Sequence, residues 1–114
     1  MKTIKIVIVS IAITGIAASI FLAAGNAKKG KLLFNDPKLS GATSGMSCNS
    51  CHPDGKGLSA AGKKKTGFKN PAGTFSTLPE TINHCITMAL KGKALKADSR
   101  EMQDLIAYIR SLKK

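Results

Sequence analysis

Apolar residues are distributed very unevenly along this chain of 114 residues. Residues 6–24 are apolar apart from a few Ser, Thr and Gly, and Lys2 and Lys5 precede them. The remainder of the chain is mostly polar and carries its apolar residues in short groups. The first group predicts a short helix over residues 28–34, whose apolar side consists of Leu32, Leu33 and Phe34.

Two further helices have clear start signals near the C-terminus. Thr77 and Glu80 stand at the spacing of a capping box with a proline in the first turn, and Gly92 is a natural stop, so we expect a helix over residues 78–91. Asp98 begins the second helix by the same logic. Its apolar positions recur every three to four residues and predict one buried face with Tyr108 beside it: Met102, Leu105, Ile106, Ile109 and Leu112.

The segments between these helices lack periodicity. Residues 35–47 are rich in Gly, Ser and Pro and predict a loop. Residues 52–76 contain many Gly and Pro and predict a longer irregular loop. Because so long a loop is unusual inside a compact domain, it favours a segment wrapped around a cofactor. The fold class that follows is all-α, with three to four helices.

The motif Cys48-Asn49-Ser50-Cys51-His52 carries the clearest chemistry. C-x-x-C-H is the attachment pattern of a c-type haem. Two thiols one helical turn apart can each form a thioether with one haem vinyl group, and the following histidine then lies under the iron as its proximal ligand. The motif therefore predicts one covalent haem c, bound by Cys48 and Cys51, with His52 on the iron.

Two other interpretations of the cysteines are weaker. A thioredoxin-like C-x-x-C needs a βαβ context, and no strand-like run precedes Cys48. A structural zinc site needs four ligands, usually as two spaced pairs. His84 and Cys85 are adjacent, and the sequence has no second C-x-x-C.

The N-terminal residues have the pattern of an export signal. The apolar residues 6–24 follow a lysine-bearing start, and Gly25 and Ala27 are small residues of the kind that a signal peptidase reads. We therefore expect residues 1–27 to be a signal peptide and residues 28–114 to form the domain. The apolar stretch is also close to the ~18 residues that can span a bilayer, so a retained N-terminal membrane anchor is the alternative. Either interpretation places the domain in the periplasm or another extracytoplasmic space, soluble or anchored to the inner membrane.

The chain is strongly basic, with a formal net charge of +12. Nucleic acid is the usual partner for such a charge, but export argues against it. We expect acidic redox partner proteins, or association with an anionic membrane surface. The cluster Lys63, Lys64 and Lys65 has two interpretations, a ring around the haem edge or a solvated loop.

Gly30-x-x-x-Phe34, the C-x-x-C-H motif and the last helix with Tyr108 together resemble a class I cytochrome c domain. The resemblance implies a small domain wrapped around one covalent haem, in which the first and last helices cross closely at Gly30, a residue without Cβ. One departure is clear. The Gly-Pro-x-Leu of that family, whose proline carbonyl orients the proximal imidazole, is absent, so the partner of His52 is unassigned.

The second axial ligand of the iron has several candidates: Met46, His84, Cys85, Met88 and Met102. In a helix over residues 78–91, Cys85 shares a face with the apolar residues, Met88 lies at its rim and His84 nearly opposite. Met102 belongs to the buried stripe of the last helix, and Met46 is too close to the haem motif to reach the other haem face. This geometry favours Cys85 and leaves Met88 as the second candidate.

The stretch from Cys85 through Gly92 to Met102 resembles the haem domain of thiosulfate dehydrogenases. The resemblance implies that Cys85 is the distal iron ligand. Two functions follow. The first is a monohaem c-type cytochrome, not itself an enzyme, that carries single electrons between exported or membrane-bound partners. The alternative is a haem subunit or enzyme of thiosulfate-type sulfur oxidation. The sequence favours the carrier, because the second haem domain of thiosulfate dehydrogenases is missing.

Overall fold

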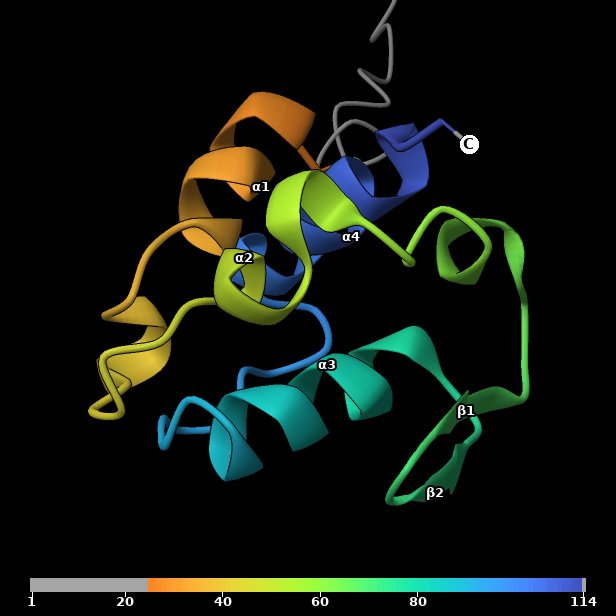
Figure 1. Cartoon of the computed structure of the whole chain (residues 1–114). Helices are drawn as coiled ribbons and strands as arrows, with labels where there is room; N and C mark the ends of the chain where they lie inside the picture. Colours follow the sequence, from red (N-terminus) through yellow and green to blue (C-terminus); the bar gives the residue numbers. More distant parts are fainter. Residues whose placement is uncertain (1–24, 114) are drawn as a thin grey trace, which may run out of the picture.

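The computed structural model describes residues 25–113 (Figure 1). The apolar residues 6–24 lie outside the described residues, as does most of the segment expected to be a signal peptide or anchor. Among residues 25–113, no helix is both long enough and apolar enough to cross a membrane.

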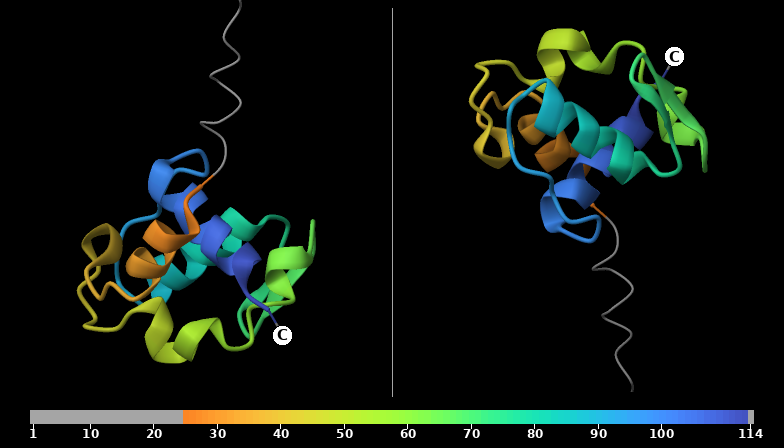
Figure 2. Two further views of the ribbon diagram at one scale, coloured as in Figure 1. Left: turned by 90° about the horizontal axis from the view of Figure 1, so that it is seen from above. Right: turned by 90° about the horizontal axis from the view of Figure 1, so that it is seen from below.

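Residues 25–113 contain four α-helices, which confirm the predicted helical class (Figure 1). Their bounds are α1 Ala27–Phe34, α2 Cys48–Cys51, α3 Leu78–Met88 and α4 Arg100–Ser111. The connections contain three short 3-10 turns, at Leu39–Gly41, Pro53–Gly55 and Ala61–Lys63. The views in Figure 1 and Figure 2 agree in showing α1 lying against α4.

The crossing of α1 and α4 depends on Gly30. This residue is buried, and a Cβ at its position would overlap the main-chain carbonyl of Asp104 on α4. One turn later the Phe34 ring meets the Tyr108 ring edge to face, with ring centroids 5.1 Å apart. The predicted close contact between the first and last helices is therefore present, and glycine permits it because it has no side chain.

The predicted apolar stripe of α4 is buried together with two polar neighbours, except at Leu112, which is the C-cap residue and is only partly buried. Met102 is fully buried. Tyr108 and Asp104 are also buried, and the sequence pattern did not place Asp104 inside. The rest of the core consists of residues from α1, α3 and the connecting segments: Phe34, Leu39, Ala42, Phe68, Leu78, Ile82, Ile86 and Leu90.

The start of α3 follows the prediction, but its end does not. The Thr77 hydroxyl accepts a hydrogen bond from the Glu80 N–H (3.2 Å), and the Glu80 carboxylate accepts one from the Thr77 N–H (3.4 Å). The helix ends at Met88, before the expected Gly92. The left-handed residue is Lys91 (φ 58°), and Gly92 donates its N–H back to the Ile86 carbonyl (2.9 Å). Gly92 therefore closes the helix end by its hydrogen bond and not by its own dihedral angle.

The start of α4 lies one residue later than predicted. Its N-cap is Ser99, whose hydroxyl accepts a hydrogen bond from the Met102 N–H (3.2 Å). Asp98 precedes the cap and is exposed. Both Asp and Ser are good caps, so a sequence that places them side by side does not distinguish the two registers.

A small hairpin interrupts the loop predicted over residues 52–76. The strands β1 Phe68–Asn70 and β2 Gly73–Phe75 are antiparallel, and Phe68 pairs with Phe75. Asn70 closes the turn, because its side chain accepts a hydrogen bond from the Ala72 N–H (2.8 Å). Strands of three residues are too short to produce a visible alternation in the sequence.

Candidate cofactor site

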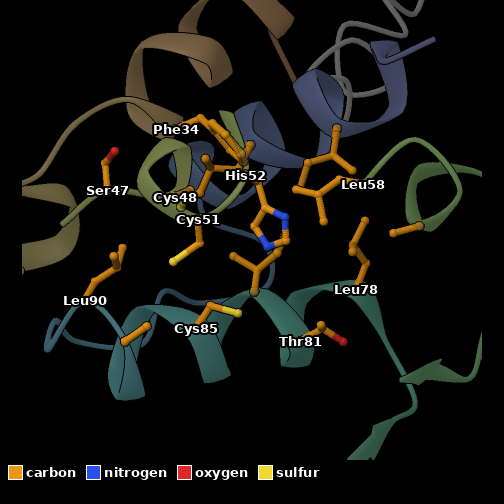
Figure 3. Close-up of a pocket in the computed structure, with 15 residues that line it drawn as sticks. Phe34, Ser47, Cys48, Cys51, His52, Leu58, Leu78, Thr81, Cys85 and Leu90 are labelled. Atoms are coloured by element: carbon orange, nitrogen blue, oxygen red, sulfur yellow. The ribbon is translucent and has the colours of Figure 1, made fainter. Parts of the chain in front are cut away.

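An apolar pocket separates α2 from α3 (Figure 3). It contains about 730 Å³ of empty space, a volume that includes the open space at its mouth. Residues from all four helices and from the loop after α2 line it: Phe34, Ser47, Cys48, Cys51, His52, Leu58, Ala61, Leu78, Thr81, Ile82, Cys85, Ala89, Leu90, Leu105 and Ile109. All three cysteines of the chain are among them.

The single turn of α2 positions the C-x-x-C-H motif. Ser47 caps this turn, and its N–H donates to the Ser50 hydroxyl (2.9 Å). The turn brings Cys48 and Cys51 to the same side, one helical turn apart. His52 ends the turn, with its N–H on the Cys48 carbonyl (3.0 Å), and its ring points from α2 into the pocket toward α3 (Figure 3).

The ring of His52 is oriented by a main-chain oxygen. Its Nδ1 lies 3.0 Å from the carbonyl oxygen of Lys56. Because a carbonyl oxygen can only accept, Nδ1 must be the protonated nitrogen, and Nε2 is left with a free lone pair on the pocket side. A histidine that binds a metal through Nε2 needs this tautomer, and the hydrogen bond from Nδ1–H fixes the orientation of the ring.

The residues around Lys56 fill the position of the Gly-Pro-x-Leu pattern, with a lysine in place of the proline. Here the run is Gly55-Lys56-Gly57-Leu58. Lys56 has φ −53°, within the range that a proline ring would impose, and Leu58 lines the pocket. The role of Lys56 could not be predicted from a proline pattern, because the interaction uses a main-chain carbonyl that any residue supplies.

Cys85 lies on the α3 wall of the pocket. Figure 3 shows the sulfur atoms of Cys51 and Cys85 in the space between α2 and α3. Burial, followed by the nearby thiol of Cys51, raises the pKa of Cys85. Burial is also the main reason why the pKa of Cys48 rises to about 11, and the neighbouring Cys85 adds to it. Three thiols thus share one apolar site that disfavours free thiolates, and thioether formation or binding of the thiolate to a metal would stabilise their sulfur atoms there.

The other candidates for the second axial ligand lie elsewhere. Met88 is 58% exposed and Met46 is 38% exposed, and neither lines the pocket. Met102 is buried in the core. His84 packs its ring on Phe75, with ring centroids 5.0 Å apart, and also lies outside the pocket lining.

Asn83 holds the helix that carries Cys85. Its side-chain NH₂ donates to the Leu95 carbonyl (2.7 Å), and its side-chain oxygen accepts from the Leu95 N–H (2.8 Å). This pair of bonds ties α3 to the connection that leads to α4. The role of Asn83 was not predicted, since an asparagine inside a helix gives no signal of a distant main-chain partner.

These residues fit a covalently bound haem. The pocket is apolar, its α2 wall presents two thiols at the spacing of two thioethers, and an imidazole nitrogen and a thiol face its interior from α2 and α3. Within residues 25–113, no group of three or more His, Cys, Asp or Glu could hold a metal ion without such a cofactor.

A comparison with protein families gives one match. The family model described as SoxA/TsdA, cytochrome c domain, matches residues 29–114. No curated protein and no solved structure matches the chain. The match covers most of the chain and agrees with the resemblance to the haem domain of thiosulfate dehydrogenases. The chain therefore belongs to the SoxA/TsdA cytochrome c family, whose c-type cytochrome domains are tied to sulfur-compound oxidation.

Proposed function

We propose that this protein is a monohaem cytochrome that transfers electrons in the oxidation of a sulfur compound of the thiosulfate type. Cys48 and Cys51 bind the haem, His52 is the proximal iron ligand and Cys85 the distal one. The observation that carries the proposal is the position of Cys85 on the α3 wall of the pocket, while Met88 is 58% exposed and outside it. The family match supports this sulfur-linked function better than the general electron carrier favoured by the sequence.

The residues of the site have distinct tasks in this proposal. The haem supplies a one-electron centre. The Lys56 carbonyl fixes His52 in the tautomer that leaves Nε2 free, at a distance of 3.0 Å from Nδ1. Cys85 supplies an anionic sulfur, which stabilises ferric iron more than a neutral thioether does. The apolar lining excludes water and strengthens both interactions.

We further propose that the chain acts as a subunit and not as a complete enzyme. Joining two thiosulfate ions through a new S–S bond releases two electrons, and one haem accepts one electron at a time. The sequence contains a single C-x-x-C-H motif. A second redox centre on a partner protein would take the other electron. The basic surface favours an acidic partner, and covalent haem attachment favours an extracytoplasmic location.

The first experiment tests the axial ligand. Cys85→Ser and Met88→Leu are compared in holoprotein made with cytochrome c maturation. Cys85→Ser should change the ferric optical and electron paramagnetic resonance spectra and raise the reduction potential. Met88→Leu, three residues further on the same helix, is the matched control and should leave both unchanged. The opposite pattern would identify Met88 as the ligand and leave Cys85 as a pocket residue.

The second experiment tests the sulfur chemistry. Ferric holoprotein is mixed with thiosulfate, and haem reduction is followed optically. The measurement is repeated after adding candidate partner proteins, which are fractions of an extract of the source cells separated by charge. We expect the wild-type ferric spectrum to respond to thiosulfate, and the Cys85→Ser variant to respond differently. A protein that exchanges electrons with acidic cytochromes but never responds to thiosulfate, alone or with any fraction, would be a general carrier.

A further inference from the structure

Asp104 is a carboxylate buried in the interface between α1 and α4, away from the cofactor site. Its residue is only 2% exposed. A buried carboxylate is unfavourable unless it accepts hydrogen bonds. Its Oδ1 accepts one from the main-chain N–H of Asn26, at 2.7 Å, across 78 positions of sequence. The partner of this carboxylate therefore belongs to the segment that the sequence analysis assigned to a removable signal.

Asn26 is integrated into the domain through three hydrogen bonds. Besides the N–H on Asp104, its side-chain oxygen accepts from the Lys29 N–H (3.1 Å), and its carbonyl accepts from the Gly30 N–H (2.9 Å). The side-chain bond makes Asn26 the N-cap of α1. Gly25, just before it, lies so close to α4 that a Cβ there would overlap the Gln103 carbonyl.

A cut after Ala27 would damage this arrangement. It would remove the N–H donor from the buried Asp104 and the cap from α1, and it would shorten the helix whose Gly30 contacts α4. A cut between Gly25 and Asn26 would preserve all three bonds. It would also turn the Asn26 nitrogen into an ammonium group, so that the contact with Asp104 becomes an ion pair.

We propose that the folded domain begins no later than Asn26, and that the Asp104 carboxylate is the acceptor for the main-chain nitrogen of Asn26. Any proteolytic processing then occurs before Asn26 and not after Ala27. The residues Ala23 and Gly25 are small at the third and first positions before a cut at Asn26, so the sequence offers a suitable site there. The proposal moves the start of the domain from Lys28 to Asn26 and does not depend on the function proposed above.

The direct experiment is the intact mass of the holoprotein purified from cells that express the full chain with cytochrome c maturation. A chain that begins at Asn26, or at any earlier residue, supports the proposal. A chain that begins at Ala27 or any later residue overturns it, because it lacks the nitrogen that binds Asp104.

A second experiment measures the coupling between Asn26 and Asp104. Holoproteins that begin at residue 26 or residue 28 are produced behind a foreign export signal, each with Asp104 or Asp104→Ala. In the longer chain, Asp104→Ala should lower the unfolding midpoint by roughly 4–8 °C or more, the effect of about one lost hydrogen bond in a domain of this size. In the shorter chain the same substitution should have little effect or raise the midpoint, because the carboxylate is already without its donor.

Two controls separate this contact from general effects. Glu101→Ala removes an exposed carboxylate from the same helix and should affect both chain lengths equally. Asn26→Ala removes the helix cap but keeps the main-chain N–H, so it should lower stability without abolishing the effect of Asp104→Ala. Equal effects of Asp104→Ala in the two chain lengths would show that Asn26 is not its partner in solution.

Discussion

The fold opposes the ionisation of Tyr108, as it opposes that of Cys48 and Cys85. Tyr108 is the single tyrosine of the chain, and it is buried against Phe34. Burial, and then the negative charge of Asp54, raises the pKa of its hydroxyl above the ordinary value of about 10. A raised pKa in the folded state means that the neutral phenol stabilises the fold at pH values below about 10, and that this contribution is lost as the pH rises through the folded-state pKa.

We predict that the free energy of unfolding falls above pH 10 more steeply for the wild type than for Tyr108→Phe. The phenylalanine keeps the edge-to-face contact with Phe34 and has no proton to lose. The measurement is denaturant unfolding of the two holoproteins between pH 7 and 11. Asp54→Asn, which removes the second cause of the shift, should reduce the difference between them. Parallel curves across this range would mean that the hydroxyl reaches solvent freely.

The residues of the cofactor site differ in how much the sequence reveals about them. Cys48, Cys51 and His52 follow from their spacing, because covalent attachment requires that spacing. The inward position of Cys85 follows from helical periodicity, which holds even though α3 ends earlier than expected. The contact of His52 with Lys56 could not be predicted, since the acceptor is a main-chain atom and its position depends on the turn at Pro53–Gly55.

At the scale of elements, the packing of α1 on α4 depends on the absence of a single side chain. Gly30 lies where a Cβ would overlap the Asp104 carbonyl and come within 2.8 Å of the Tyr108 Cβ. Main-chain atoms of a helix cannot move aside cheaply, so a methyl group must separate the two helices.

We therefore predict that Gly30→Ala destabilises the holoprotein by roughly 1–3 kcal/mol, the usual cost of overpacking, despite the better helix propensity of alanine. The control is Leu32→Ala on the same helix, where the side chain is 72% exposed and the change should be small. Thermal unfolding of the two variants beside the wild type gives the comparison. An equally stable Gly30→Ala protein would mean that the α1–α4 contact is looser in solution.

The elements were predictable where the pattern was long, and less so where it was short. The eleven and twelve residues of α3 and α4 span several turns, so their apolar faces are evident in the sequence. Their ends depend on single hydrogen bonds, such as the Gly92 N–H on Ile86 and the Met102 N–H on Ser99. The β1–β2 hairpin has too few residues for any periodicity, so that tertiary packing of Phe68 decides its conformation.

At the scale of the whole molecule, an apolar pocket is combined with a strongly positive net charge. The formal net charge of the chain is +12, and the described lysines are spread over the helices and the loops. One group consists of Lys63 and Lys64, which come two and three residues after Ala61 in the sequence, and Ala61 lines the pocket. Another group, Lys28 and Lys29, occupies the first turn of α1, at the opposite end of that helix from the pocket residue Phe34.

We predict that electron exchange with an anionic reagent depends on this charge and on its position. The second-order rate of oxidation of the ferrous holoprotein by ferricyanide should fall as ionic strength rises from 0.01 to 0.1 M, because the Debye length shrinks from ~30 to ~10 Å. Replacing Lys63 and Lys64 with Glu should lower the rate at low salt more than the same replacement of Lys28 and Lys29, although both pairs change the net charge equally. The rates are measured by stopped-flow spectroscopy of the haem. If both double variants lose the same factor, net charge attracts the reagent and the loop after Ala61 has no special part. If salt has no effect on the wild type, electrostatic attraction does not guide the encounter at all, and the proposed preference for an acidic partner fails with it.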